Sequence, residues 1–160
     1  MGSTCVGGTC LATNFVTNGD FETGDFTGWT LTDCYPGWTY VGTQARYSVG
    51  PVVGSEHGNY FAETICYYAG PPTLQQTITG LSVGQTYTMT AYYNGFGNGT
   101  PDSVTFYVDG IQIASRTNQG SADGWFLVTG SFTASAASAV FSFKFASDPG
   151  SPGVDNIVIM

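Results

Sequence analysis

The feature that most constrains the fold of this chain is an alternation of apolar and small polar residues with a period of two. It runs through residues 86–93 (TYTMTAYY), 103–108 (SVTFYV) and 140–145 (VFSFKF). Such alternation is typical of a β-strand that buries one face. The Thr and Ser residues between the apolar ones are poor helix formers, and Gly or Pro interrupts the chain about every ten residues. The sequence therefore predicts many short strands and no helix.

Shorter alternating runs predict two further strands, over residues 29–32 and 38–41. The dipeptide Asp109-Gly110 separates 103–108 from another apolar run, 111–114, and Asp-Gly in this position is the usual signal of a two-residue hairpin turn. Many short strands separated by turns indicate a sandwich or a barrel. With 160 residues and no linker, the chain is expected to form a single all-β domain.

The parity of each run predicts which side chains face the core. The residues of one parity are apolar, and most are large: Tyr87, Met89, Ala91 and Tyr93; Val104, Phe106 and Val108; Phe141, Phe143 and Phe145. Such rows can pack between two sheets that lie about 10 Å apart. Tyr92 and Tyr107 have the opposite parity, so they are predicted to lie on polar outer faces.

The chain is poor in charge, and its net charge is negative. Charged residues make up 9% of the sequence, and 11 Asp and Glu face 3 Lys and Arg, for a net charge of −8. Binding to nucleic acids and to anionic membranes depends on clustered Lys and Arg, so neither partner is expected. No apolar run approaches the ~20 residues that span a membrane, so insertion is not expected either. A surface of uncharged polar residues, together with the cysteines, favours a secreted, extracellular protein.

The four cysteines, Cys5, Cys10, Cys34 and Cys66, allow three disulfide pairings. The preferred pairing joins Cys5 to Cys10 around a short Gly-Gly loop and joins Cys34 to Cys66 between two strands or their loops. The alternative is that some of them are buried free thiols. The chain has no CxxC pair and a single histidine, His57, which is expected in a solvated loop, so a zinc site is not indicated.

The segment Asn14–Trp29, with the sequence NFVTNGDFETGDFTGW, resembles the opening of carbohydrate-binding modules of families 4, 9 and 22. The resemblance continues, in the order that such modules show, through residues 58–63, 74–78, 81–87 and 154–157. It implies a two-sheet antiparallel jelly-roll β-sandwich of the galactose-binding-like group over residues 14–160. Residues 1–13, which contain Cys5 and Cys10, fall outside the pattern and are expected to form a separate arm or loop.

The resemblance also implies a structural calcium ion between the first and last strands, with Glu22 and Asp155 as ligands. The loop before residue 58 contributes in those modules, which makes Glu56 and nearby carbonyls further candidates. Asp155 shares the parity of Ile157 and Ile159, and a carboxylate on an apolar face must be paired, hydrogen-bonded or metal-bound. Calcium takes about 6–8 oxygen ligands, including backbone carbonyls, so two scattered carboxylates can begin a site. The alternative is that Glu22 and Asp155 only hold the amides of turns.

Aromatic side chains are abundant, and exposed Trp and Tyr rings can cover the apolar face of a sugar while amides bind its hydroxyl groups. The candidate ligand-binding residues are Trp38, Tyr40, Tyr67, Tyr68, Tyr92 and Tyr107, with Gln75 and Asn94 as polar neighbours. For each of these residues alone, packing at the core or at an edge is an equal alternative. Trp29 and Trp125 are assigned to the core.

No set of residues indicates catalysis. Asp20, Glu22 and Asp25 are close enough in sequence for a glycosidase acid pair, but they belong to the turn-rich opening segment, which already accounts for them. The sequence has no Gly-x-Ser-x-Gly elbow and no phosphate-binding loop. We therefore expect a non-catalytic extracellular module that binds a neutral polysaccharide or glycan. The alternative is a self-assembling structural subunit of an extracellular fibre, sheath or adhesin.

Overall fold

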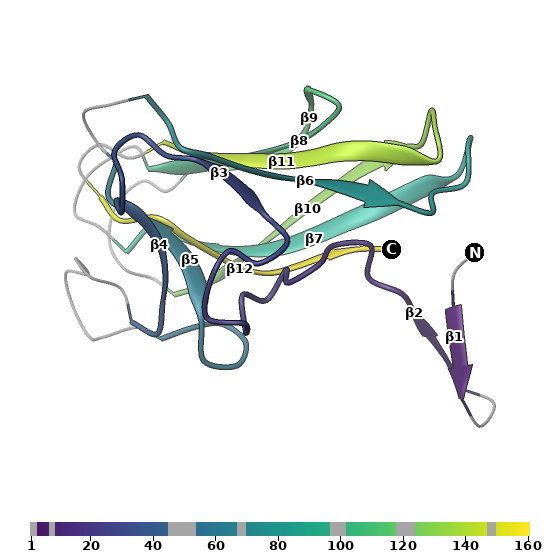
Figure 1. Cartoon of the computed structure of the whole chain (residues 1–160), viewed down its shortest axis with the longest axis horizontal. Coiled ribbons are helices and arrows are strands. Elements are labelled where there is room, and N and C mark those ends of the chain that lie inside the picture. The colour runs from purple at the N-terminus through teal and green to yellow at the C-terminus, as the bar shows by residue number, and fades with distance from the viewer. Residues whose placement is uncertain are drawn as a thin grey trace.

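Figure 1 shows the computed structural model, in which two β-sheets pack face to face. The structure describes residues 3–6, 9–44, 54–66, 70–96, 102–117, 124–146 and 150–160, with the backbone alone for 3–6 and 9–12. Every regular element in these ranges is a strand, so they contain no helix that is long and apolar enough to cross a membrane. The all-β prediction is confirmed.

Each sheet of the sandwich has five strands, and all neighbouring strands are antiparallel. The first sheet has the order β10-β7-β12-β5-β4, with β4 (Thr39–Gly42), β5 (Phe61–Thr64), β7 (Thr86–Asn94), β10 (Phe126–Thr133) and β12 (Gly153–Ile159). The second sheet has the order β3-β6-β11-β8-β9, with β3 (Thr30–Thr32), β6 (Thr73–Thr79), β8 (Ser103–Val108), β9 (Ile111–Thr117) and β11 (Ser138–Ala146). The predicted jelly-roll sandwich of two antiparallel sheets is therefore confirmed.

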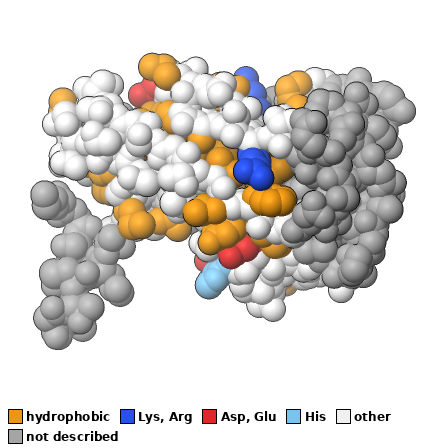
Figure 2. Space-filling model, turned by 180° about the vertical axis from the view of Figure 1, so that it is seen from behind, with side chains coloured by type: hydrophobic (Ala, Val, Ile, Leu, Met, Phe, Trp, Pro, Cys, Tyr) orange, Lys and Arg blue, Asp and Glu red, His pale blue; other side chains and the backbone are white. Residues whose placement is uncertain are grey.

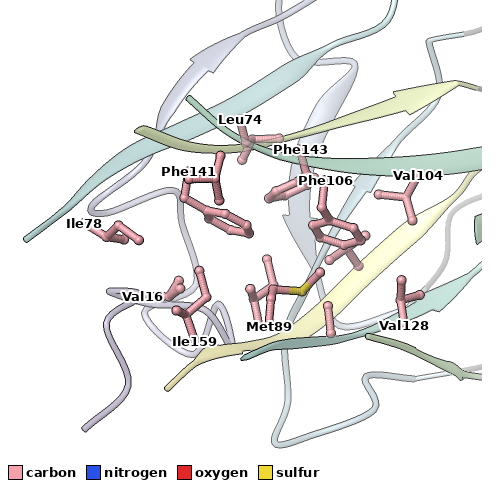
Figure 3. Packing of buried hydrophobic residues seen from close by; sticks show 14 of the residues in the cluster. Val16, Leu74, Ile78, Met89, Val104, Phe106, Val128, Phe141, Phe143 and Ile159 are labelled. Atoms are coloured by element: carbon pink, nitrogen blue, oxygen red, sulfur yellow. The ribbon is translucent and has the colours of Figure 1, made fainter. Parts of the chain in front are cut away.

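The core lies between the two sheets, and strand parity identifies the residues that form it. In Figure 3, Met89 and Ile159 of the first sheet point toward Phe106 and Phe143 of the second, and all four are fully buried. Each side chain in the three predicted rows is buried. Trp29 joins them, with its ring centroid 5.3 Å from that of Phe143, so its assignment to the core is confirmed.

The predicted hairpin turn at Asp109-Gly110 connects β8 to β9. Both residues have positive φ angles, of 49° and 77°, as the favoured two-residue hairpin turn requires. The carboxylate of Asp109 accepts a hydrogen bond from the Val140 amide at 2.8 Å, and this bond attaches the turn to the neighbouring strand β11. The Asp-Gly sequence and the hydrogen bond to β11 therefore favour the same turn conformation.

The opening segment folds against the last strand and so joins the two ends of the chain. The Asn14 side chain donates to the Ile157 carbonyl and accepts from the Ile159 amide, at 3.0 and 2.9 Å. Gly19 accepts from the Ile157 amide at 2.8 Å, and a Cβ at residue 19 would overlap the Ile157 carbonyl oxygen. Only glycine permits this close approach. The opening and closing motifs of the sequence therefore lie side by side in the fold.

The disulfide between Cys34 and Cys66 is confirmed, with the two Cα atoms 6.0 Å apart. It ties the connection between β3 and β4 to the residues that follow β5. Cys5 and Cys10 are backbone partners in a separate hairpin of β1 (Ser3–Val6) and β2 (Thr9–Ala12), which forms a two-stranded sheet of its own. Their side chains lie outside the described part of the structure, so their pairing stays a prediction.

Candidate functional site

The outer face of the first sheet carries a strip of accessible apolar side chains. Tyr92 on β7 lies opposite Leu127 on β10, and both point away from the core. Leu127 is 53% exposed, and Tyr92 is half-buried. Trp125 is two residues before Leu127 and is also half-buried. We call Trp125, Leu127 and Tyr92 the apolar strip.

Trp125 was expected in the core but lies on this outer face, where its own contacts hold the ring in place. The indole Nε1 donates to the Gly54 carbonyl at 3.0 Å. The ring stands edge-on to Phe61 and Phe96, with centroids 5.4 and 5.3 Å away. Sequence reasoning missed this position because Trp125 precedes its strand, so strand parity does not assign it a face.

Phe61, at the start of β5, and Phe96 form a small buried cluster on the outer face of the first sheet, over Gly153 of β12. A Cβ at Gly153 would lie 2.6 Å from Phe96 and 3.1 Å from Phe61, so a larger residue there would displace the rings. Asn94 helps to fold Phe96 back over the sheet, because its side-chain oxygen accepts from the Phe96 amide at 3.0 Å. Asn94 itself is 1% exposed, and its Nδ2 finds no hydrogen-bond partner among the described residues.

Tyr40 and Trp38 lie toward the other edge of the same sheet. Strand register places Asn94, Gly153, Glu63 and Tyr40 in one row across four strands, on the outer face. Trp38, just before β4, packs against Tyr35 with the ring centroids 5.4 Å apart, and Tyr35 is 61% exposed.

Sequence reasoning missed Tyr35. The available signal was a Pro36-Gly37 turn with an aromatic residue on each side, which leaves both rings at the turn that connects β3 to β4. The loop is held by Asp33, whose carboxylate accepts from the Cys34 amide and the Thr39 hydroxyl at 2.9 and 2.8 Å. Tyr67 and Tyr68, two further candidates, lie outside the described residues.

Tyr107 and Gln75 come together on the opposite side of the molecule. Strand register aligns Gln75, Ser142 and Tyr107 on the outer face of the second sheet. The Lys144 ammonium lies 5.3 Å from the centre of the Tyr107 ring. Tyr92 and Tyr107 are on polar outer faces, as parity predicts, but on different sheets, so one platform cannot contain both. Figure 2 shows, on one side of the molecule, hydrophobic groups scattered among uncharged polar atoms.

Asp155 does not point along the apolar face, because strand β12 contains a bulge. Asp155 pairs with Tyr92 and Val158 pairs with Thr90, so three steps along β12 correspond to two along β7. The extra residue reverses the parity, and Asn156 has the positive φ of 48° that such a bulge can require. Ile157 and Ile159 therefore face the core while Asp155 lies on the outer face beside Tyr92. The predicted common face of these three residues is wrong.

The carboxylates of Asp155 and Glu22 both hold amides of the loop formed by residues 54–60. Asp155 Oδ2 accepts from the amides of Glu56 and His57 at 2.8 and 2.9 Å, and its Oδ1 accepts from the Asn156 amide at 2.7 Å. Glu22 Oε1 accepts from the amides of Asn59 and Tyr60, both at 2.7 Å. Glu56 accepts from the Asn156 side chain at 3.2 Å, and the His57 side chain is exposed, as expected.

Burial and hydrogen bonding shift the pKa values of these two carboxyl groups in opposite directions. Burial raises the pKa of Asp155 to about 6, although the amides of His57, Asn156 and Glu56 act against it. Burial also acts to raise the pKa of Glu22, but the hydrogen bonds from Asn59 and Tyr60 outweigh it and hold that pKa below its usual value. Charge on Glu22 is therefore favoured by folding, and charge on Asp155 is disfavoured.

The carboxylates of Glu22, Glu56 and Asp155 do not gather within 4.8 Å of one another in the described structure. Calcium needs several oxygens that converge on one point. In the described part of the chain, the one trio of acidic, Cys or His ligand atoms within 4.8 Å of one another is Asp33, Cys34 and Cys66, and its two cysteines form the disulfide. Glu22 and Asp155 instead hold amides, which is the arrangement of the alternative hypothesis. Calcium binding stays a prediction for experiment.

Comparison with known proteins defines the class of fold. No protein-family model and no curated protein sequence matches the chain. Among solved structures, TmCBM61 bound to β-1,4-galactotriose matches with a TM-score of 0.65 and 16% identity, over 93% of this chain and 99% of that one. The CBM22-1 xylan-binding domain of Paenibacillus barcinonensis Xyn10C matches with a TM-score of 0.59 and 15% identity, over 91% and 89%.

The same fold also occurs in a protein that is not a carbohydrate-binding module. A cyclase from Fischerella sp. TAU matches with a TM-score of 0.63 and 16% identity, over 90% of this chain and 94% of that one. All three identities are low, so the likeness concerns the fold alone. The chain thus has the jelly-roll sandwich fold found in carbohydrate-binding modules, and this fold also occurs in a cyclase.

Proposed function

We propose that this domain binds a neutral glycan, without catalysing a reaction on it, at the outer face of the first sheet. The observation that carries the proposal is the apolar strip of Trp125, Leu127 and Tyr92, whose side chains are accessible on a face bordered by polar groups. Aromatic rings cover the apolar face of a sugar, and nearby amides and hydroxyls bind its polar edge. Likeness in fold to a module bound to β-1,4-galactotriose and to a xylan-binding domain supports the same proposal.

Trp125 is held in place before any ligand arrives. Its indole is hydrogen-bonded to Gly54 and braced by two buried rings, so little side-chain freedom is lost on binding. Tyr40, Trp38 and Tyr35 lie toward the opposite edge of the same sheet. Between these rings and the strip, Phe61, Glu63 and Asp155 are fully buried, so the strip is the accessible part of the face to which we assign sugar binding.

We propose a neutral glycan and no catalysis because of where the charged side chains lie. Lys144 packs over the Tyr107 ring on the other sheet and Arg116 packs over the Phe126 ring, so both described cations are engaged with aromatic rings outside the strip's own three residues. Asp155, the carboxylate beside Tyr92, is buried and holds amides. Cyclases share the fold, so the fold alone does not decide against catalysis. The Cys34–Cys66 disulfide supports an extracellular location.

Calorimetry with β-1,4-galactotriose and a xylan oligosaccharide, preceded by a screen on a glycan array, tests the proposal. Wild type should bind a neutral glycan with a Kd roughly in the micromolar to millimolar range usual for shallow, wet sites. Tyr92→Ala and Trp125→Ala should weaken binding about tenfold or more, because each removes a stacking ring. Tyr107→Ala is the matched control, since it removes a half-buried tyrosine from the opposite face. Loss of binding in Tyr107→Ala alone would assign the site to the second sheet.

The second candidate function is a structural subunit that self-assembles. One observation favours it: the β1–β2 hairpin forms its own two-stranded sheet and pairs with neither sheet of the sandwich (Figure 1). A strand edge of this kind can accept a strand from another chain. If wild type binds no glycan, light scattering decides. Concentration-dependent assembly that is lost when residues 1–13 are removed would establish this second function in place of the first.

A further inference from the structure

The loop of residues 54–60, which we call the bracing loop, lies between the apolar strip and the two carboxylates. At its start, the Gly54 carbonyl accepts the Trp125 indole N–H at 3.0 Å. The next described contacts along the loop are the amides of Glu56 and His57, which both donate to Asp155 Oδ2. A single residue, Ser55, therefore separates the position that holds Trp125 from the positions that Asp155 holds.

The rest of the bracing loop is fixed independently. The Ser55 hydroxyl donates to the Gly58 carbonyl at 2.8 Å, which closes a turn inside the loop. Gly58 has a φ of +67°, and a Cβ there would overlap the Glu22 carboxylate. Glu22 then holds the amides of Asn59 and Tyr60 at the far end. Asp155 thus holds the end of the loop that contains Gly54, the acceptor of the Trp125 indole, and Glu22 holds the end that leads to Phe61.

We propose that Asp155 is a positioning residue of the ligand-binding face, which sets the Trp125 indole through the bracing loop. Its carboxylate is fully buried and accepts two loop amides on one oxygen. Without that acceptor, the two amides would be left without partners, so the loop must move to satisfy them. Movement at Glu56 displaces Gly54, and the indole loses the carbonyl that orients it. Asp155 also lies opposite Tyr92 in the strand register, so this carboxylate is next to both parts of the strip.

The structural part of this proposal is tested without any ligand. The full chain labelled with 5-fluorotryptophan gives three ¹⁹F resonances, from Trp29, Trp38 and Trp125, and Trp125→Phe assigns the last. In EDTA, Asp155→Ala, which removes the acceptor, should shift or broaden the Trp125 resonance and leave the other two in place. Glu22→Ala is the matched control, because it removes the acceptor of the Asn59 and Tyr60 amides instead. Its Trp125 resonance should move less than that of Asp155→Ala.

An unchanged Trp125 resonance in folded Asp155→Ala would overturn the proposal. If that variant does not fold, Asp155→Glu keeps the charge but moves the acceptor, and an unchanged resonance there overturns the proposal equally. The consequence for affinity rests on the proposed function. Asp155→Ala should weaken glycan binding about three- to tenfold, as expected from one lost orienting hydrogen bond, while Glu22→Ala should weaken it less. A shifted resonance with no glycan bound by wild type would retain the positioning role and reject the proposed function.

Discussion

At the scale of single residues, Asp155 shows how one extra residue in a strand redirects a carboxylate and changes its titration. The bulge after Asp155 places the side chain beside Tyr92 rather than among the apolar residues of the core. The group is nevertheless fully buried, because the bracing loop covers it. Burial disfavours the charged form, and the pKa of Asp155 rises to about 6.

We expect the free energy of unfolding, measured by urea titration in EDTA, to fall as the pH rises from about 4 to about 6. Asp155 has an ordinary pKa of 3.8 when unfolded and a pKa of about 6 when folded. The folded state therefore binds more protons in this window, so stability is greatest below it and declines until the folded group has ionised. The full effect amounts to at most about 3 kcal/mol.

Two variants isolate this effect. Asp155→Asn does not titrate at this position, so the decline should disappear. The effect of Glu22 on stability has the opposite dependence on pH. The pKa of Glu22 is lowered from 4.5 by folding, so its contribution to the free energy of unfolding is present above pH 4.5 and is lost as the pH falls further. Glu22→Gln should reduce the free energy of unfolding near neutral pH. It should still show the decline from about pH 4 to about pH 6 that Asp155 causes. Identical pH profiles for wild type and Asp155→Asn would contradict the assignment.

At the scale of elements, the connection between β3 and β4 has little regular structure but is fixed by cross-links. The Cys34–Cys66 disulfide attaches it to the end of β5, and Asp33 bonds to Thr39 at the start of β4. Buried hydroxyls of Thr39 and Thr64 meet at 3.1 Å beside it. This connection presents Tyr35 and Trp38, so its order is a condition for presenting those rings.

Removing the disulfide should destabilise the fold. The bridge closes a sequence separation of 32 residues, which corresponds to about 3–4 kcal/mol in the chain-entropy model. The double variant Cys34→Ala, Cys66→Ala should lower the free energy of unfolding by that amount in a urea titration. The matched control is Cys5→Ala, Cys10→Ala, whose positions are in the separate hairpin and should leave the unfolding of the sandwich unchanged. Free thiols at Cys34 and Cys66 in non-reducing peptide mapping would refute the pairing.

At the scale of the whole molecule, the fold brings together segments from the beginning, middle and end of the chain. The opening segment bonds to β12 through Asn14 and Gly19, and the bracing loop is held from both sides by Glu22 and Asp155. These contacts bring residues more than 130 positions apart into one junction. A cation at this junction would bind the folded chain alone, because the unfolded chain does not assemble it.

Calcium is therefore expected to raise the melting temperature. A ligand that binds only the folded state stabilises it by mass action, by about 2.7 kcal/mol at a concentration of 100 Kd. Scanning calorimetry in EDTA and in millimolar calcium measures the difference for wild type and for Asp155→Ala. Wild type should melt higher in calcium, and the variant should melt equally in both buffers. Equal melting of wild type would reject the calcium ion, and the hydrogen bonds of Glu22 and Asp155 to loop amides would be the whole function of those carboxylates.

The sequence alone predicted the strands β3, β4, β7, β8, β9 and β11, the inward faces of β7, β8 and β11, and the turn at Asp109-Gly110. These features depend on neighbours a few residues away: the pleat alternates side chains, and Asp-Gly adopts positive φ at little cost. Parity alone therefore assigns Phe106 and Phe143 to the core, and it assigns Tyr92 and Tyr107 to outer faces in the same way. The motifs at the two ends of the chain indicate the same sandwich.

The tertiary structure decided which outer faces belong together. Parity assigns a residue to one side of its own strand, but strand order decides whether two strands share a sheet, and this order depends on contacts between distant segments. Tyr92 and Tyr107 lie on different sheets for that reason, and Gln75 joins Tyr107 through Ser142. The bulge at Asp155 and the position of Trp125 also depend on distant partners, the neighbouring strand β7 and the bracing loop. A binding face is built from such long-range pairings, so it exists only once the sheets are assembled.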